Sequence, residues 1–413
     1  MTFLHSSTTL AKAHTSRTAT PLSYAATVVC IVLVAVDLRP AIVSLGPLLP
    51  MIRAQFALTN TQAALLTTIP AVLMGVLAFP APWLAHRFGR DRMILLALAL
   101  LMTATGLRAL AATTFELLAA TVAVGAGIAI AGALIPGFVK QSYPRRAAIL
   151  MGIYAMSLGL GSTLAAALAH PLALFGNGWR FSTGVFALPC LVAIGAWMMV
   201  ARSQAEALPT QLADARGSGI PIRNRTAWLL ALYSTLNNVL FFGLVSWTAP
   251  MFREFGMSDA TAGLVLASFT AAFMFGNPAA ALLSRTDDRR TTIAFFALLA
   301  LVGTIIEAVS PGLLPFVFIP MIAFGVGGTF TLTMILPLDN ASTARDANNW
   351  TGFVMGIGYL AGSFGPLSIG MLRDVTGSFA APAWLLASVA LLTLTLSPFL
   401  QPHHHRAARH RSA

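Results

Sequence analysis

Charged residues are scarce in this sequence. Asp, Glu, Lys and Arg make up 9% of its 413 residues, whereas a soluble domain has roughly 25%. Acidic residues are especially few, with 13 in the whole chain. So little charge cannot cover the surface of a soluble protein, while 57% of the residues are hydrophobic and the mean hydropathy is +0.80. The composition predicts a protein that crosses a membrane many times.

Cysteines and the common catalytic motifs are also rare or missing. Cys30 and Cys190 are the only cysteines and lie in apolar segments, so the sequence indicates neither a disulfide framework nor a metal site. It has no Walker A loop for ATP, no nucleophile elbow and no zincin motif. Neither an enzyme nor a cofactor is predicted. The net charge of +12 is divided among small clusters between apolar runs, which does not fit a nucleic-acid partner.

Twelve hydrophobic segments dominate what remains. Each is long enough to cross about 30 Å of hydrocarbon at about 1.5 Å of helix per residue. We therefore expect an all-α polytopic membrane protein with the lipid bilayer as its partner. The expected segments are 24–49, 61–84, 93–112, 117–139, 147–174, 180–201, 226–251, 260–283, 291–309, 312–337, 350–372 and 379–400.

Lysine and arginine predict the orientation of these segments. If the N-terminus is cytoplasmic, most of the 25 Lys and Arg residues fall in connections on the cytoplasmic side. This bias predicts that both termini are cytoplasmic. The basic residues that lie elsewhere are Arg39, Arg53, Arg108, Arg180, Arg253 and Arg373.

The chain repeats internally. The run PMIRAQF at 50–56 is matched by PMFREF at 250–255, and the loop HRFGRDR at 86–92 by SRTDDRR at 284–290. Parallel halves of this kind predict two pseudo-symmetric six-helix bundles. The expected parts are a cytoplasmic tail at 1–23, a first bundle at 24–201, a cytoplasmic linker at 202–225, a second bundle at 226–400 and a basic tail at 401–413.

Two charges lie near the middle of the first segment, in the run IVLVAVDLRPAIVSLGPLLP at 31–50. A charge at this depth costs at least ~2.5 kcal/mol on insertion scales and is expected to face protein or a water-filled cavity. Pro40 loosens the helix directly after Arg39. Because the arginine guanidinium is a planar fork that suits a small anion or a polar ring, we expect Arg39 to bind or gate a solute.

The role of Asp37 has two alternatives. Two residues of helix turn a side chain by roughly 200°, so Asp37 and Arg39 face one cavity together only if the helix is distorted at Pro40. Desolvation and a nearby arginine have opposite effects on the proton affinity of a buried carboxylate. The sequence leaves open both proton coupling and a structural pair with Arg39 or another helix, and the short separation favours the pair.

The loop PWLAHRFGRDR at 82–92 resembles the loop signature of the major facilitator superfamily. The positions that fit are Leu84, Arg87, Gly89 and Arg90, while Pro82 and His86 stand where glycine and aspartate are usual. The resemblance implies the major facilitator fold and a role for this loop in conformational switching. The residues expected to govern switching are Arg87, Gly89 and Arg90, with Arg289 and Arg290 in the repeat.

Other stretches are similar to the cyanate and nitroimidazole transporter branch of that superfamily. Among them are LRPAIVSLGPLLPMIR at 38–53 and GIGYLAGSFGPLSIGMLRDVTGS at 356–378. The resemblance implies secondary transport in a bacterial inner membrane. Asp37 and Gly132 stand where the branch tends to have asparagine, so the solute itself stays open.

Polar and aromatic residues of later segments are expected along the solute path. Asn237 and Asn238 repeat the positions of Asp37 and Leu38, and their amides suit either a polar solute or contacts between helices. Arg108 and its repeat partner Glu307 are instead expected to extend to the membrane interface. The expected substrate-binding residues are Arg39, Asp37, Asn237, Asn238, Ser44, Phe241, Thr331 and Tyr359, with Tyr154 as a lesser candidate.

The leading hypothesis is a secondary active transporter that works by alternating access. Its expected substrate is a small polar or anionic solute, such as a cyanate-like anion or a nitroimidazole-like heterocycle, and protons are a candidate coupling ion. The alternatives are a membrane sensor on a transporter fold and a drug-efflux carrier of broader specificity. A sensor of this kind is expected to carry a long extra domain, and no connection in this sequence is long enough to form one. A monomer is expected.

Overall fold

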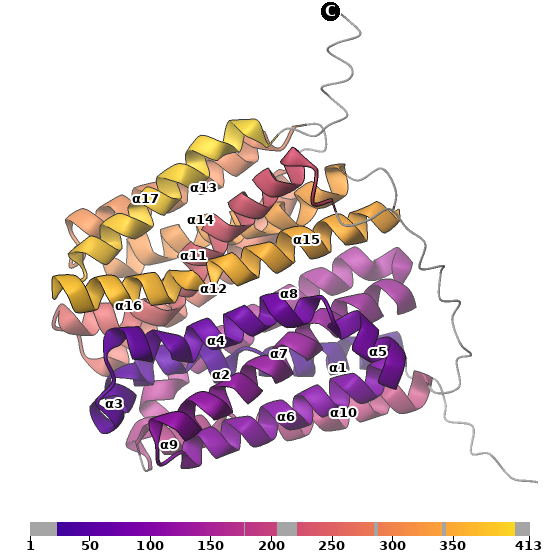
Figure 1. Cartoon of the computed structure of the whole chain (residues 1–413), viewed down its shortest axis with the longest axis horizontal. Helices are drawn as coiled ribbons and strands as arrows, with labels where there is room; N and C mark the ends of the chain where they lie inside the picture. The colour runs from indigo at the N-terminus through magenta and orange to yellow at the C-terminus, as the bar shows by residue number, and fades with distance from the viewer. Residues whose placement is uncertain (1–22, 177, 205–220, 285–287, 341–343, 401–413) are drawn as a thin grey trace, which may run out of the picture.

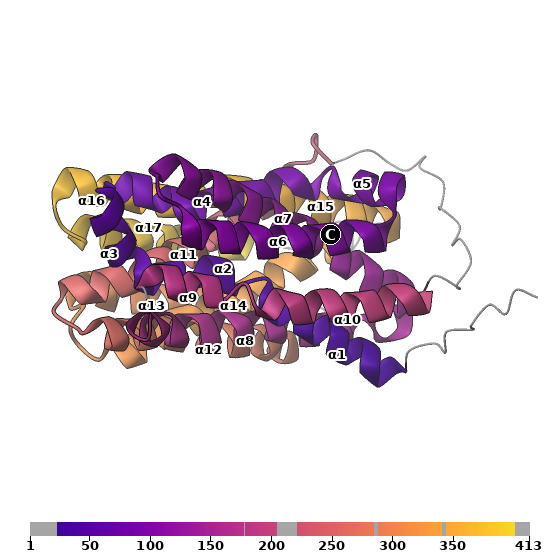
Figure 2. The ribbon, with the colours of Figure 1, turned by 90° about the horizontal axis from the view of Figure 1, so that it is seen from below.

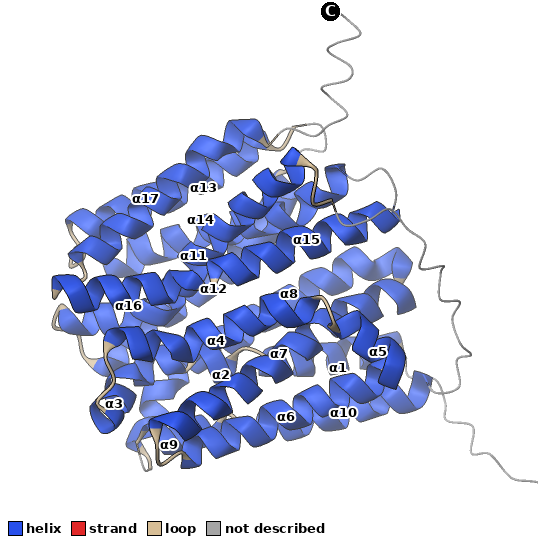
Figure 3. Ribbon diagram, viewed as in Figure 1, coloured by secondary structure: helices blue, strands red, loops and turns tan. Residues whose placement is uncertain are grey.

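Helices make up almost all of the described structure (Figure 3). The computed structural model describes residues 23–176, 178–204, 221–284, 288–340 and 344–400. Nearly all of the expected tails and most of the expected linker lie outside these residues. Within the described ranges there is no strand, and twelve segments are long and apolar enough to cross a membrane. The expected all-α polytopic fold is confirmed.

The helices divide into two sets of similar order. The first half of the chain forms α1 (Tyr24–Asp37), α2 (Pro40–Val43), α3 (Leu45–Phe56), α4 (Asn60–Ala78), α5 (Ala81–Phe88), α6 (Arg90–Leu110), α7 (Thr114–Ser142), the 3-10 turn η1 (Pro144–Arg146), α8 (Ala147–Leu174), α9 (Trp179–Val185) and α10 (Pro189–Gln204). The second half forms α11 (Arg225–Glu254), α12 (Asp259–Leu283), α13 (Arg290–Val309), α14 (Pro315–Asn340), α15 (Ala344–Gly362), α16 (Phe364–Thr376), α17 (Ala380–Leu396) and η2 (Ser397–Phe399).

The two halves lie side by side, with their helices along the long axis of the molecule (Figure 1, Figure 2). Following the orientation predicted from the basic residues, we call the end where α4, α7 and α12 begin the outer end. The end where α1, α6 and α11 begin is the inner end. The position of a residue along a span is described relative to these two ends.

The two halves meet closely along several pairs of helices. On α4, a Cβ atom at Gly75 would lie 2.7 Å from the backbone nitrogen of Leu360 on α15. On α8, a Cβ atom at Gly159 would lie 2.7 Å from the Cβ of Met274 on α12. Small residues let helices approach closely in a membrane. The surface between the halves is therefore built largely by α4 against α15 and α16 and by α8 against α12.

The first span, Tyr24–Phe56, is broken where the sequence predicts it. Leu38 and Arg39 form a turn between α1 and α2, and Pro40 begins α2. Because proline has no N–H to donate to the preceding turn, the helix cannot run through this point unchanged. The span is longer than expected and ends at Phe56, since Pro50 is accommodated inside α3.

Candidate functional site

Arg39 lies in the break between α1 and α2, where the two halves meet. Its guanidinium carbon is 5.7 Å from the ring centre of Phe241 on α11. The hydroxyl of Tyr359 on α15 lies beside the same guanidinium, and Tyr154 on α8 lies near it. One cation and three aromatic side chains, contributed by both halves, therefore meet at one place. We call these four residues the Arg39 site.

The rings on the second half are held by other aromatic side chains. Phe241 lies 4.6 Å from Phe273 and 5.2 Å from Phe242 between ring centres, and Phe242 lies 6.1 Å from Tyr359. Offset and tilted ring pairs at these distances are favourable. The rings therefore keep a fixed orientation toward the arginine. A guanidinium over an aromatic face still has N–H groups in its plane, which can bind an acceptor.

Asp37 does not pair with Arg39. Its side chain is 2% exposed, and neither carboxylate oxygen has a hydrogen-bond partner among the described residues. Its polar neighbour is the Cys190 thiol on α10, within the same half. The expected pair with Arg39 is wrong because the turn at Leu38 does not cancel the wide angle between side chains two residues apart. The polar neighbour comes from another helix instead.

The expected amide and hydroxyl residues lie at contacts between helices of the second half. The Asn237 amide donates to Thr329 and to the Val326 carbonyl on α14. The Asn238 amide donates to the Ser234 carbonyl on its own helix at 2.9 Å. Thr331 donates at 2.8 Å to Asn277 on α12. The structure therefore brings Arg39, Phe241 and Tyr359 together. It uses Asn237 and Thr331 to join helices, whereas Asn238 bonds within its own helix.

Ser44 lies apart from this group as well. It connects α2 to α3 and is fully buried. Its hydroxyl has no partner in the part of the chain that is described. The structure therefore places Ser44 beside the broken helix and not in contact with Arg39.

A carboxylate joins the outer ends of the two halves. Asp374 on α16 accepts hydrogen bonds from the backbone N–H groups of Asn60 and Thr61 at 3.0 and 2.7 Å, and from their side chains at 2.7 and 2.6 Å. The first N–H groups of a helix have no partner within it. Thr59 caps only the Gln62 N–H of α4, so Asp374 supplies the acceptor for the other two. We call Asn60, Thr61 and Asp374 the outer lock.

Sequence reasoning missed the outer lock. A carboxylate near the C-terminal end of a helix is unfavourable, because the helix dipole is negative there. Asp374 occupies such a position in α16. That misplaced charge is the signal that Asp374 needs donors from another element, although it does not say which element provides them.

Further polar contacts between the halves lie toward the outer end. Ser246 on α11 donates to Thr67 on α4 at 2.8 Å. His170 Nδ1 on α8 lies 3.9 Å from an Asp259 oxygen on α12, and Arg253 holds the same carboxylate at 2.7 Å. Together with the outer lock, these contacts close the outer end in this structure.

Known proteins share both the sequence pattern and the fold. The profile of the Major Facilitator Superfamily matches residues 27–366. The chain belongs to the Major Facilitator Superfamily. It is 30% identical over 381 residues to the cyanate transport protein CynX of Escherichia coli (strain K12), which covers 90% of this chain and 97% of that protein.

A second relative and a solved structure agree with this assignment. The 2-nitroimidazole transporter of the same strain is 30% identical over 372 residues, or 89% of this chain and 93% of that protein. The crystal structure of a D-xylose-proton symporter has a TM-score of 0.75 at 14% identity, over 92% of this chain and 98% of that chain. The expected branch of the superfamily and its fold are confirmed.

The loops that resemble the superfamily signature tie helices together at the inner end. Arg90 donates to Gln141 at 2.9 Å and lies 4.7 Å from the Phe138 ring centre, both on α7. In the repeat, Arg289 donates to Asp339 on α14 at 2.6 Å. Arg290 pairs with Asp288 at 2.6 Å, Gly89 has a φ of 90°, and Arg87 is exposed. Their role in superfamily switching remains a prediction.

Arg108 and Glu307 do not extend to the interface. Arg108 is fully buried and donates at 2.7 Å to the Ala41 carbonyl in α2, beside the break in the first span. Glu307 on α13 is 1% exposed. The expectation of interfacial side chains is wrong because both residues point into their own half. Arg108 stabilises the broken helix.

Proposed function

We propose that this protein is a secondary transporter of a small anion or flat heterocycle with delocalised π electrons, and that the Arg39 site binds the solute. We place it in a bacterial inner membrane with both termini cytoplasmic, as the basic residues and the bacterial relatives favour. The observation that carries the proposal is the position of Arg39 between the halves, facing Phe241 and Tyr359 from the other half.

The chemistry of this site suits such a solute. An arginine donates two parallel hydrogen bonds to an oxygen-bearing group, and its planar face and the aromatic rings pack against a flat π system. Two relatives are named for cyanate and for 2-nitroimidazole. Both compounds are small, have delocalised electrons and present an oxygen or nitrogen acceptor. Their common features match what a guanidinium among aromatic rings recognises.

The two halves support an alternating mechanism. The site takes Arg39 from one half and Phe241 from the other, so a rocking motion changes its access without dismantling either half. The outer lock holds the outer end closed through hydrogen bonds that such a motion would break. Solute then exchanges with the inner side in this state and with the outer side after the lock opens.

Binding and counterflow together test the proposal. Purified protein is screened for thermal stabilisation by cyanate, nitrite and 2-nitroimidazole, with chloride as the control anion. A stabilising compound is then tested for counterflow in proteoliposomes. We expect stabilisation that chloride does not give, followed by saturable counterflow. Binding without flux would support the sensor instead, and counterflow of many unrelated apolar cations would support a broad drug-efflux carrier.

Replacing Asp37 by asparagine is expected to leave transport nearly unchanged. The carboxylate faces Cys190 within the first half rather than the Arg39 site, and a buried amide costs less than a buried charge. Both gradient-driven accumulation and counterflow should stay within about twofold of the unmodified protein, given that substitutions away from a functional feature have small effects. Loss of accumulation with normal counterflow would show that Asp37 carries the coupling proton.

A further inference from the structure

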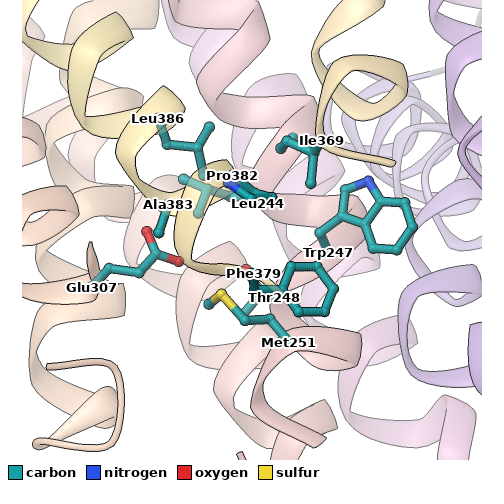
Figure 4. Close-up of a pocket in the computed structure, with 11 residues that line it drawn as sticks. Leu244, Trp247, Thr248, Met251, Glu307, Ile369, Phe379, Pro382, Ala383 and Leu386 are labelled. Carbon is teal, nitrogen blue, oxygen red and sulfur yellow. The ribbon is translucent and has the colours of Figure 1, made fainter. Parts of the chain in front are cut away.

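The second half encloses a small cavity near its outer end (Figure 4). Its walls come from α11, α13, α16 and α17, with Trp247, Ile369, Phe379 and Leu386 among the lining residues. Nearly all of this lining is apolar. Glu307 projects from α13 toward Ala383 of α17 and is the one acidic side chain on the wall (Figure 4).

Among the described residues, Glu307 has no neighbour that would stabilise a negative charge. Neither of its oxygens has a hydrogen-bond partner within the described part of the chain. An isolated carboxylate in such surroundings costs several kcal/mol or more, and a buried group avoids this cost by taking a proton. The geometry therefore requires a carboxylic acid at this position in the present arrangement.

The charged groups on the surrounding helices are already engaged. At the outer ends of α11 and α16, Glu254 pairs with Arg373 at 2.8 Å, and Asp374 is in the outer lock. Arg253 pairs with Asp259 of α12 at 2.7 Å, and His170 of α8 faces the same carboxylate. The cavity residues contributed by α17 are apolar. None of these described groups therefore neutralises Glu307.

A proton fits this cavity better than a metal cation. Hard cations take about six or more oxygen ligands, whereas the cavity offers Glu307 and one further free hydroxyl, that of Thr248. The remaining polar group, the Trp247 indole N–H, already donates to the Pro366 carbonyl at 2.9 Å. Two side chains can hold a proton and a water, but not a dehydrated metal ion.

The cavity wall also touches the outer lock. A Cβ atom at Gly370 on α16 would lie 3.1 Å from the Trp247 ring and 2.7 Å from the Asn60 carbonyl oxygen. Gly370 therefore lies between Trp247, which lines the cavity, and the segment that carries Asn60. Any widening of the cavity at Trp247 therefore changes how α16 packs against α4.

We propose that Glu307 is a proton-binding site that controls the outer lock. With the proton bound, the apolar walls stay packed and Asp374 stays on the first turn of α4. When the O–H bond of the acid breaks, the proton passes to water at the outer end and the carboxylate remains. That charge must be hydrated, so α11, α16 and α17 separate and the lock opens. The inference rests on the proposed alternating mechanism, but not on the identity of the solute.

The test uses the full chain in lipid nanodiscs with spin labels at Ala54→Cys and Leu313→Cys. Ala54 on α3 and Leu313 beyond α13 are exposed at the outer ends of the two halves, and the native cysteines are buried. The distance between the labels is measured between about pH 4 and about pH 10. This range includes the pKa of an ordinary glutamate, about 4.3, and that of deeply buried glutamates, about 8–9. We expect a longer distance at high pH in the unmodified protein.

Glu307→Gln should abolish that change and keep the short distance at every pH, because the amide is neutral and similar in size. Infrared spectra should show a protonated carboxyl band that disappears at high pH and is absent from the variant. Asp37→Asn and His170→Gln are the controls, since each removes another buried or bridging titratable group. A pH-dependent distance that survives in Glu307→Gln, or one lost only in His170→Gln, would overturn the proposal.

The outcomes separate this inference from the proposed function. Neither readout contains a solute, so a failed search for cyanate or nitroimidazole counterflow leaves the proton site standing. A carboxyl band and a distance that respond to sodium at constant pH would assign the site to a cation and overturn it. If Glu307→Gln fails to fold, Glu307→Asp keeps the ionisable group but moves it within the cavity. The pH response should then persist with a shifted midpoint, and a midpoint that does not shift would count against the proposal.

Discussion

Replacing Arg39 by lysine is expected to reduce transport about 10- to 100-fold at solute concentrations below saturation. The substitution keeps the positive charge but loses the planar fork, so one hydrogen bond to the solute and the flat contact with Phe241 are lost. A hydrogen bond to a charged group contributes about 1.5–3 kcal/mol, and each 1.4 kcal/mol is about tenfold in affinity. Initial rates of counterflow in proteoliposomes measure the effect.

The control for this experiment is Arg180→Lys. Arg180 on α9 also lies over an aromatic ring, 4.9 Å from the Trp179 ring centre, but it is within the first half at the outer end. We expect this variant to transport almost normally, and both variants to elute as folded protein in equal amounts. Near-normal transport by Arg39→Lys would remove the planar recognition of the solute from the mechanism, since charge alone would then suffice.

Replacing Asp374 by alanine is expected to open the outer end. The variant loses four hydrogen bonds to the first turn of α4, where they also join the two halves. If the closed state loses about 3 kcal/mol of stabilising free energy, the ratio of closed to open protein falls about 150-fold. The distance between labels at Ala54→Cys and Leu313→Cys should therefore lengthen without any solute and at any pH.

Two further variants make this result specific. Glu254→Gln removes an ion pair with Arg373 at the same end, but that pair lies wholly within the second half, so we expect the distance to stay short. Asp374→Asn keeps one acceptor oxygen and should have an intermediate effect. An unchanged distance in Asp374→Ala would mean that apolar packing of α16 on α4 alone keeps the outer end closed.

Most of the fold could be predicted because its determinants are local in the sequence. Each span needs only about twenty apolar residues in a row, and the twelve spans lie at the expected places. The break at Pro40 was predictable for the same reason, since a proline has no N–H wherever it stands. Span ends were less predictable: the first span continues to Phe56 because a proline can be accommodated near the end of a membrane helix.

The candidate site was predictable in part. Arg39 was identified by its depth, Phe241 because it follows two asparagines of a later segment, and Tyr359 as a polar aromatic residue of another later segment. Their meeting point depends on how the two halves pack, and so does the place of Tyr154. Asn237 and Thr331 were expected on the solute path, but in the structure they join α11 and α12 to α14, because a buried amide or hydroxyl takes the nearest acceptor on a neighbouring helix.

The sequence by itself determined that this chain spans a membrane twelve times, repeats in two halves and places a guanidinium inside the first span. Hydrophobicity, charge and proline act within a few residues of where they occur, so one chain read in order is enough to see them. Only the tertiary structure decided which way the buried acids point. Asp37 turns to Cys190, Glu307 to an apolar cavity, and Asp374 to α4 across more than three hundred residues of chain. The partner of each acid comes from a distant segment, and packing alone brings that segment near.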